Sequence, residues 1–200
     1  MTKLQPAFYQ QTDVAAIARQ LLGKILVTQT AGVRTAGIIV ETEAYAGITD
    51  RASHAWNNRR TKRTEIIYAP GGVAYIYLCY GIHYLFNVIT NARDVPHAVL
   101  VRALEPLEGI EAMKSRYGSK APPKFTAGPG SLCKAMGINA AQNGESLSGD
   151  KIWIEAAAEI ADENILTGTR VGVQYAEEDD YLPYRFSIKN NPWVSKGKGL

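Results

Sequence analysis

One run of the chain restricts the fold more than any other. Residues 36–45 read AGIIVETEAY, so Glu41 and Glu43 stand inside a segment of small and β-branched apolar residues, which is typical of a buried strand. Residues i and i+2 of a strand share a face, so Glu41, Glu43 and Tyr45 should point the same way. An unpaired buried carboxylate is costly. The two acids therefore either brace the structure through ion pairs or perform acid–base chemistry, and position alone does not decide between these interpretations.

The other elements are expected to be short and joined mostly by hairpins. Asp13 and Gly23 frame an expected helix over residues 14–22, and further helices are expected over residues 106–116 and 131–136. Strands are expected over residues 25–28, 35–43, 73–79, 84–90, 97–103, 151–155, 170–174 and 185–188. This order favours an α+β domain on a mainly antiparallel sheet over a doubly wound parallel sheet. With 200 residues and no repeat or linker, residues 1–200 are expected to form a single domain.

Composition excludes several classes of protein. No apolar run reaches the ~18–20 residues that span a bilayer, and the N-terminus lacks the apolar core of a signal peptide, so we expect a cytoplasmic protein with no membrane partner. Cys79 and Cys133 lie in apolar contexts and are expected to be free thiols. The three histidines form no metal-binding pattern, and no glycine-rich phosphate loop is present. We therefore expect neither a metal nor a cofactor.

Positive charge is concentrated in one short stretch, although the net charge is only +3. The cluster consists of Arg51, Arg59, Arg60, Lys62 and Arg63. A solvated loop is the commonest explanation of such a cluster, but Trp56 and two asparagines lie among these charges, which favours a phosphate-binding surface. We assign phosphate binding to the last four basic residues of the cluster.

The expected hairpin over residues 73–90 carries an aromatic side chain at its turn. Tyr75 and Tyr77 share a face of the first strand, and the turn falls at Tyr80-Gly81. A tyrosine at a hairpin tip buries little surface, so a role in the core is doubtful. It is either a surface residue packed on a neighbouring loop or a wedge that unstacks two bases of a duplex.

Two polar residues interrupt the apolar strands that follow. Asn87 stands within LFNVI and must satisfy its amide, either with backbone groups or with the edge of a purine. Arg102 stands within VLVRAL and is expected to pair with Glu41 or Glu43, to bind a phosphate, or to orient a catalytic acid.

Several of these segments together strongly resemble the alkyladenine (3-methyladenine or methylpurine) DNA glycosylase family, in its compact bacterial form. The matching segments are IVETEAY at 39–45, SH at 53–54, YIYLCYG at 75–81 with Asn87, LVRALEP at 100–106, GPGSLCKA at 128–135, YRF at 184–186 and PWVS at 192–195. They span nearly the whole chain in the family's order. The resemblance implies a curved antiparallel sheet with surrounding helices and a protruding hairpin.

The resemblance also implies a role for each matching residue. Glu43 is similar to the general base that activates a water for attack on the sugar C1′, and Arg102 to a residue that holds this water or a phosphate beside it. Tyr45 and Tyr77 resemble aromatic walls on either side of a flipped base.

Three more roles follow from the same resemblance. His54 resembles a residue that hydrogen-bonds the base or its sugar–phosphate, and Asn87 one that disfavours the amine of normal guanine. Tyr80 matches the residue that fills the gap in the duplex. Thr64 and His83 depart from residues common in the family, so the contacts around them are expected to differ from the family pattern.

The implied activity is that of a monofunctional DNA-3-methyladenine glycosylase. Such an enzyme flips damaged purines (3-methyladenine, 7-methylguanine, hypoxanthine or ethenoadenine) out of duplex DNA and hydrolyses the N-glycosidic bond. We expect it to act as a monomer without an obligate protein partner, associated with the nucleoid through DNA. Two alternatives remain at this point: a glycosidase on free sugars or nucleosides that uses a carboxylate pair, and a non-catalytic nucleic-acid-binding module.

Overall fold

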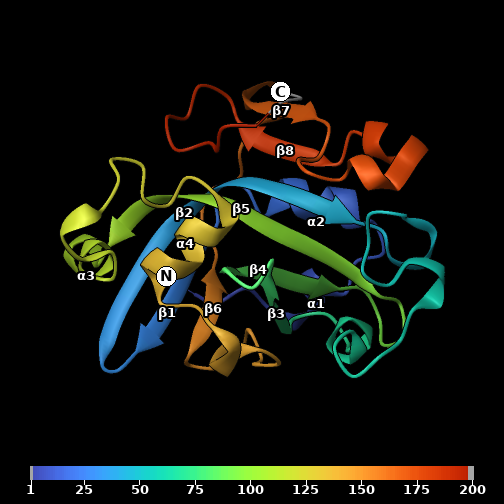
Figure 1. Ribbon diagram of the computed structural model, residues 1–200, viewed down its shortest axis with the longest axis horizontal. Helices are drawn as coiled ribbons and strands as arrows, with labels where there is room; N and C mark the ends of the chain where they lie inside the picture. The colour runs from blue at the N-terminus through green and yellow to red at the C-terminus, as the bar shows by residue number, and fades with distance from the viewer. Residues whose placement is uncertain (1, 198–200) are drawn as a thin grey trace.

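The sheet is curled and antiparallel throughout its named pairings. The computed structural model describes residues 2–197, and its strands follow the order β3-β4-β5-β2-β1-β6, while β8 pairs with both β2 and β7 (Figure 1). The strands are β1 Ile25–Thr30, β2 Val33–Tyr45, β3 Ala74–Cys79, β4 His83–Thr90, β5 His97–Glu108, β6 Ile152–Glu155, β7 Ile165–Gly168 and β8 Arg185–Ile188. Strands and short helices on one antiparallel sheet confirm the predicted α+β class.

The helices are short. The α-helices are α1 Pro6–Tyr9, α2 Val14–Gln20, α3 Ile110–Ser115 and α4 Pro129–Met136. The 3₁₀ turns are η1 Gly47–Thr49, η2 Trp56–Asn58, η3 Glu65–Tyr68, η4 Gly118–Lys120, η5 Ala140–Gln142, η6 Asp162–Asn164 and η7 Gln174–Tyr181. No helix in the described part of the chain is long and apolar enough to cross a membrane.

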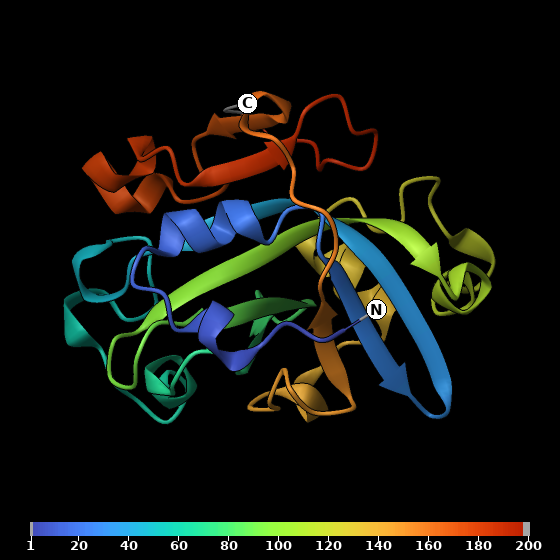
Figure 2. The same cartoon turned by 180° about the vertical axis from the view of Figure 1, so that it is seen from behind.

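Two helices cover the sheet from opposite sides, as the front and back views show (Figures 1 and 2). The predicted N-cap of α2 is confirmed, because the Asp13 side chain accepts hydrogen bonds from the first turn. The apolar face of α2 buries Ile17 and Ala18, and α4 buries Leu132 and Met136. All four side chains belong to the same main core, which also contains residues of β2, β4 and β5.

Strand β2 is the element on which the site is built. Its first half pairs with β1, its second half pairs with β8 through Glu41–Glu43, and β5 pairs along most of its other edge. Register shifts in the β2–β5 ladder flank Glu41. β8 pairs with β2 beyond the point where the pairing with β1 ends. The half of β2 that carries the acids therefore has a neighbouring strand on both sides and does not lie at the margin of the sheet.

Two sequence predictions were wrong. The strand predicted over residues 170–174 is irregular, since Arg170 turns inward to an acid and Gly172 has a φ of +78°; the strand of this region is β7, five residues earlier. The helix predicted over residues 106–116 begins only at Ile110. Pro106 extends β5, opposite Gly37 at a register shift that accommodates a residue without an N–H.

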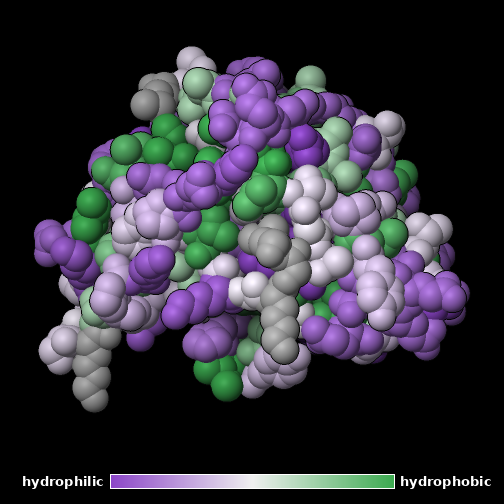
Figure 3. All heavy atoms as spheres, turned by 90° about the horizontal axis from the view of Figure 1, so that it is seen from above, coloured by the Kyte–Doolittle hydropathy of each residue, from purple (hydrophilic) through white to green (hydrophobic). Residues whose placement is uncertain are grey.

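The C-terminal segment closes the molecule on one side. It contains β7, η7 and β8 and lies across the top of the sheet in Figure 1. From above, hydrophilic side chains on this face are interspersed with smaller hydrophobic groups (Figure 3).

Candidate active site

Glu41 is the centre of a buried ion-pair network. Its Oε1 accepts hydrogen bonds from Nε of Arg102 and Nε of Arg185, both at 2.8 Å, and its Oε2 accepts one from the Ser195 backbone N–H at 2.7 Å. Burial alone would raise the pKa of Glu41, but the two arginines outweigh it and hold the pKa below its usual value. This carboxylate is therefore ionised and fully engaged in ion pairs, which agrees, for Glu41, with the first of the two interpretations of these acids.

Glu43 is equally buried but differently surrounded. Its Oε1 accepts a hydrogen bond from the Val171 N–H at 2.7 Å and lies 3.2 Å from Nη1 of Arg102, while its Oε2 accepts from the Tyr45 hydroxyl at 2.9 Å. Burial raises the pKa of Glu43 above its usual value, although Arg102 works against the rise. Such a carboxylate is a stronger base than a solvated one.

Arg102 joins the two acids. Its guanidinium contacts both Glu41 and Glu43, and its side chain is only 6% exposed. The prediction that it pairs with these carboxylates is confirmed. Because the guanidinium is planar and charged at all working pH values, it fixes the orientation of both carboxylates at once.

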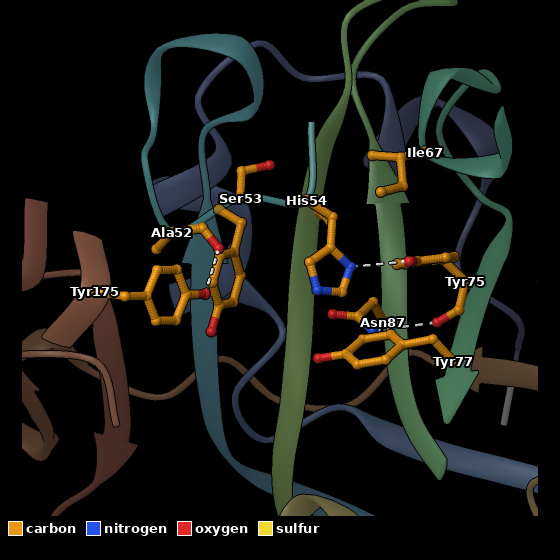
Figure 4. A pocket seen from close by; sticks show the side chains of 10 residues that line it. Ala52, Ser53, His54, Ile67, Tyr75, Tyr77, Asn87 and Tyr175 are labelled. Atoms are coloured by element: carbon orange, nitrogen blue, oxygen red, sulfur yellow. Dashed lines mark hydrogen bonds between the residues drawn. The ribbon is translucent and has the colours of Figure 1, made fainter. Parts of the chain in front are cut away.

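A pocket opens next to Tyr45, the residue whose hydroxyl donates a hydrogen bond to Glu43. Its lining comes from β2, β3, β4, β5, η3, η7 and the loop before η2. It consists of Tyr45, Ala52, Ser53, His54, Ile67, Tyr75, Tyr77, Asn87, Ala98 and Tyr175. In the close-up, His54 and Tyr77 stand on one side of the pocket and Tyr175 on the other (Figure 4). Tyr45 connects pocket and acid, because its ring lines the space and its hydroxyl bonds Glu43.

His54 is held in a neutral form. Its Nδ1 lies 2.9 Å from the Tyr75 hydroxyl, and its ring packs edge-on to Tyr77 at a centroid distance of 4.6 Å. Burial lowers the pKa of His54 to about 4, and the nearby charges of Arg63 and Arg59 act in the same direction. At neutral pH this ring is therefore a hydrogen-bonding and stacking group, not a cation.

Asn87 offers one free end to the pocket. Its amide nitrogen donates to the backbone carbonyl of Tyr75 at 3.2 Å, which fixes the side chain against β3. The residue is 4% exposed and lines the pocket. The position of Asn87 is thus compatible with both predictions for its amide. The amide nitrogen bonds the backbone, and the amide oxygen faces the cavity.

The β3–β4 hairpin ends in a turn with an exposed aromatic ring. Tyr80 is 91% exposed and Ile82 is 71% exposed. Tyr80 and Gly81 both have positive φ, +50° and +71°, as the two central residues of a primed β-turn require, and the Ile82 N–H donates to the Cys79 carbonyl across this turn. A bulky residue is disfavoured at such a φ, so neither local conformation nor burial accounts for a tyrosine at this position.

Comparison with known proteins decides the family. The sequence profile of the methylpurine-DNA glycosylase family matches residues 7–192. The chain belongs to this family. Among its relatives, a protein of Bacillus cytotoxicus is 45% identical over 97% of this chain and 100% of its own length. Proteins of Clostridium acetobutylicum and Chlamydia abortus are each 46% identical, over 96% and 94% of this chain and 97% and 100% of their own lengths. All three bear the provisional name 3-methyladenine DNA glycosylase.

The members of the basic cluster of this glycosylase-family chain differ in whether their charges are already paired, and so in how available they are to bind phosphate. Arg60 is engaged by Glu65 and Asp94, both at 2.7 Å, and Arg51 is paired with Glu177. Arg63 lies over the Tyr77 ring. The remaining two members, Arg59 and Lys62, form no ion pair among the described residues and are exposed.

The two departures from the family pattern have local explanations. Thr64 is buried, and its hydroxyl donates to the Arg59 carbonyl at 3.0 Å, so it shapes the loop of the basic cluster. His83 is the first residue of β4. It lies so close to Gly130 that a Cβ added to this glycine would be only 2.7 Å from Cγ of the His83 ring. His83 therefore packs the hairpin against the start of α4.

Sequence reasoning missed the contribution of the C-terminal segment. Arg185, Ser195 and Val171 bind the two acids, and Tyr175 lines the pocket with its hydroxyl 3.1 Å from the Ala52 carbonyl. Arg185 and Ser195 stand out in the sequence only as parts of family motifs, and no periodic pattern marks Val171 or Tyr175. No cluster of histidine, cysteine or acidic side chains among residues 2–197 could hold a metal ion.

Proposed function

We propose that the protein is a monofunctional DNA glycosylase that excises damaged purines from duplex DNA, in keeping with the names of its relatives. The observation that carries the proposal is the contact between pocket and acid: the Tyr45 ring lines a cavity with aromatic walls, and its hydroxyl holds Glu43. A planar base fits between aromatic faces, and a buried carboxylate beside it can take a proton from water.

The reaction follows from this arrangement. Tyr80 fills the space that the damaged nucleotide leaves in the duplex, and the base enters the pocket between Tyr45 and Tyr77. Glu43 accepts a proton from a water molecule as the water oxygen attacks C1′. The bond from C1′ to the purine nitrogen breaks, and its electron pair leaves with the base. Arg102 keeps the carboxylate oriented and ionised.

Charge on the substrate changes what the protein must supply. A purine alkylated at N3 or N7 is cationic and becomes neutral as it leaves, so no acid is required. The ionised Glu43 also stabilises positive charge that develops on the sugar. A neutral purine such as hypoxanthine additionally needs a proton, and no acid suited to deliver it lines the described pocket.

Two further features support a monofunctional hydrolase. No lysine lines the described pocket, so a Schiff base with the sugar is not expected. The carboxylate of Glu41 is fully hydrogen-bonded by Arg102, Arg185 and Ser195. It therefore does not supply the second free carboxylate that a sugar hydrolase of the paired-acid type requires. We propose that the protein works as a cytoplasmic monomer on DNA, without a cofactor.

Glu43→Gln tests this function directly. Glutamine keeps the shape but cannot take the proton, so base release from duplexes containing 3-methyladenine or hypoxanthine should fall about 100-fold or more. Binding of the same duplexes should persist. Base release is measured by alkaline cleavage at the abasic sites, and borohydride should trap no covalent protein–DNA adduct.

A matched substitution guards against a general effect of removing an acid. Glu108→Gln changes a half-exposed carboxylate at the end of β5, whose partner is Arg34. This variant should release bases at the wild-type rate. Undiminished release by Glu43→Gln would refute the role of Glu43, and wild-type protein that releases none of the four lesions would refute the function.

A further inference from the structure

Both aromatic walls of the pocket carry an arginine against the ring. The guanidinium of Arg170 lies 4.9 Å from the centre of the Tyr45 ring, and that of Arg63 lies 5.5 Å from the centre of the Tyr77 ring. Both distances are within the range of cation–π attraction. A base between the two walls would therefore lie near two positive groups.

The two arginines differ in how their charge is compensated. Arg170 is fully buried and forms two hydrogen bonds to the buried carboxylate of Asp50, at 2.6 and 2.9 Å. The positive charge of Arg170 is therefore largely cancelled by the negative charge of Asp50, and the pair contributes little net charge at the pocket. Arg63 is exposed and faces no carboxylate within hydrogen-bond distance among residues 2–197.

The charge of Arg63 acts on groups inside the pocket. After burial, it is the largest cause of the lowered pKa of His54. It also works against the burial that raises the pKa of Tyr75. Both residues line the pocket. A positive charge that disfavours a protonated histidine at this place must also disfavour another cation there.

We propose that Arg63 sets the charge preference of the pocket, by disfavouring cationic alkylated purines relative to neutral damaged purines. A ring attracts a cation through its electron-rich face, and a guanidinium already over Tyr77 repels a second cation on the same ring. A neutral purine stacks on Tyr77 without this repulsion. The inference rests on the proposed glycosylase function and names a residue that shifts the ratio between cationic and neutral lesions.

The same residue was assigned to phosphate binding, and the two roles have different consequences. A phosphate contact strengthens binding of every duplex alike and changes no ratio between lesions. A charge beside the base changes the ratio between a cationic and a neutral lesion in the same duplex.

Single-turnover base release with Arg63→Gln separates the two roles. Two duplexes of identical sequence carry either 7-methylguanine, which is cationic, or hypoxanthine, which is neutral, at the same position. The ratio of the 7-methylguanine rate to the hypoxanthine rate should rise about threefold or more in the variant. Spontaneous release of 7-methylguanine is subtracted with a protein-free sample.

Two further variants serve as controls. Lys62→Gln removes a neighbouring positive charge that contacts no ring among the described residues, and it should leave the ratio unchanged even if it weakens DNA binding. Arg63→Lys keeps the charge near the pocket and should keep the ratio closer to that of the wild type than Arg63→Gln does. Added salt should shift the wild-type ratio toward that of Arg63→Gln, because Arg63 is exposed to screening.

An unchanged or lowered ratio in Arg63→Gln would overturn the inference, and so would an equal rise in Lys62→Gln. Wild-type protein that releases neither base from these duplexes would instead overturn the proposed function, and no ratio could then be measured. Thermal unfolding of each variant verifies that folding is intact, which is expected because the Arg63 and Lys62 side chains are exposed.

Discussion

Tyr45 combines two tasks at the scale of a single residue. Its ring is a wall of the pocket, and its hydroxyl supplies one of the hydrogen bonds that hold Glu43. A base stacked on this ring is therefore positioned by the same side chain that orients the proposed general base. Glu43 and Glu41 are only two residues apart in sequence, yet burial leaves the pKa of Glu43 raised, whereas the charges and hydrogen bonds around Glu41 together outweigh burial and lower its pKa.

The raised pKa of Glu43 predicts how activity depends on pH. The carboxylate must be ionised to accept a proton, so base release should decline as pH falls through a pKa above the usual value near 4.5. The rate of 7-methylguanine release is measured from about pH 4 to about 6.5, where this base stays cationic. His54, with a pKa of about 4, stays neutral over most of this range.

His54→Asn is the control for this assignment. The acidic limb should keep its midpoint in the variant, although the rate itself drops because a pocket contact is lost. A midpoint that moves with this substitution would assign the titration to the histidine and not to Glu43.

The tip of the β3–β4 hairpin is not specified by packing in the core. Strand pairing from Ala74–Val88 to Cys79–His83 is regular, and Leu85 and Phe86 bury their side chains. The tip beyond the last pair contributes almost nothing to the core. A Cβ added to Gly81 would meet no atom within 4 Å, so the turn is open to solvent and to a ligand.

Tyr80→Ala should separate stability from activity. The side chain is 91% exposed, so the free energy of unfolding should change by no more than about 0.5 kcal/mol. Base release should fall about tenfold or more, because a wedge that fills an unstacked step offsets a cost of a few kcal/mol. Urea unfolding and base release are the two measurements.

Tyr181→Ala is the matched control, since this tyrosine of η7 is also exposed, at 79%. It should change neither stability nor base release. Wild-type base release by Tyr80→Ala would show that the tip ring does not act as a wedge.

At the scale of the molecule, Glu41 ties three distant parts of the chain together. Its carboxylate receives hydrogen bonds from β5 through Arg102, from β8 through Arg185 and from the C-terminal segment through Ser195. Both buried guanidinium groups form an ion pair with this acid. Removing one partner of a buried ion pair is costly because it leaves the other charge without a counter-ion.

Glu41→Gln should therefore lower the free energy of unfolding by about 3–5 kcal/mol. The measurement is urea unfolding at neutral pH. Glu108→Gln at the exposed end of β5 should change it by no more than about 0.5 kcal/mol. Equal stability of Glu41→Gln and wild type would mean that the network orients groups without holding the segments together.

Much of this arrangement could be predicted from local pattern. The buried strand with Glu41, Glu43 and Tyr45 on one face, the hairpin with Tyr80 at its tip and the pairing of Arg102 with the acids all follow from strand periodicity and the cost of buried charge. Strand and hairpin are each encoded within a few consecutive residues.

What could not be predicted comes from contacts over long separations. Arg185 lies 144 positions from Glu41, and Val171 lies 128 positions from Glu43. The β-rich composition of residues 170–174 predicted a strand, but the buried pair of Arg170 with Asp50 and the positive φ of Gly172 override that propensity. Tyr175 belongs to a polar 3₁₀ segment that has no apolar period to reveal which side faces a cavity.

The late position of these contacts has a consequence for synthesis of the protein. A nascent chain that has emerged only through β5 contains Glu43, Tyr45, Tyr77 and Arg102, but it lacks the Val171 N–H and the Arg185 guanidinium. In such a chain Arg102 alone must compensate both carboxylates. The candidate site is therefore completed only after β8 and Ser195 have left the ribosome, so such a truncated product would lack both Tyr175 of the pocket and the contacts that hold Glu43.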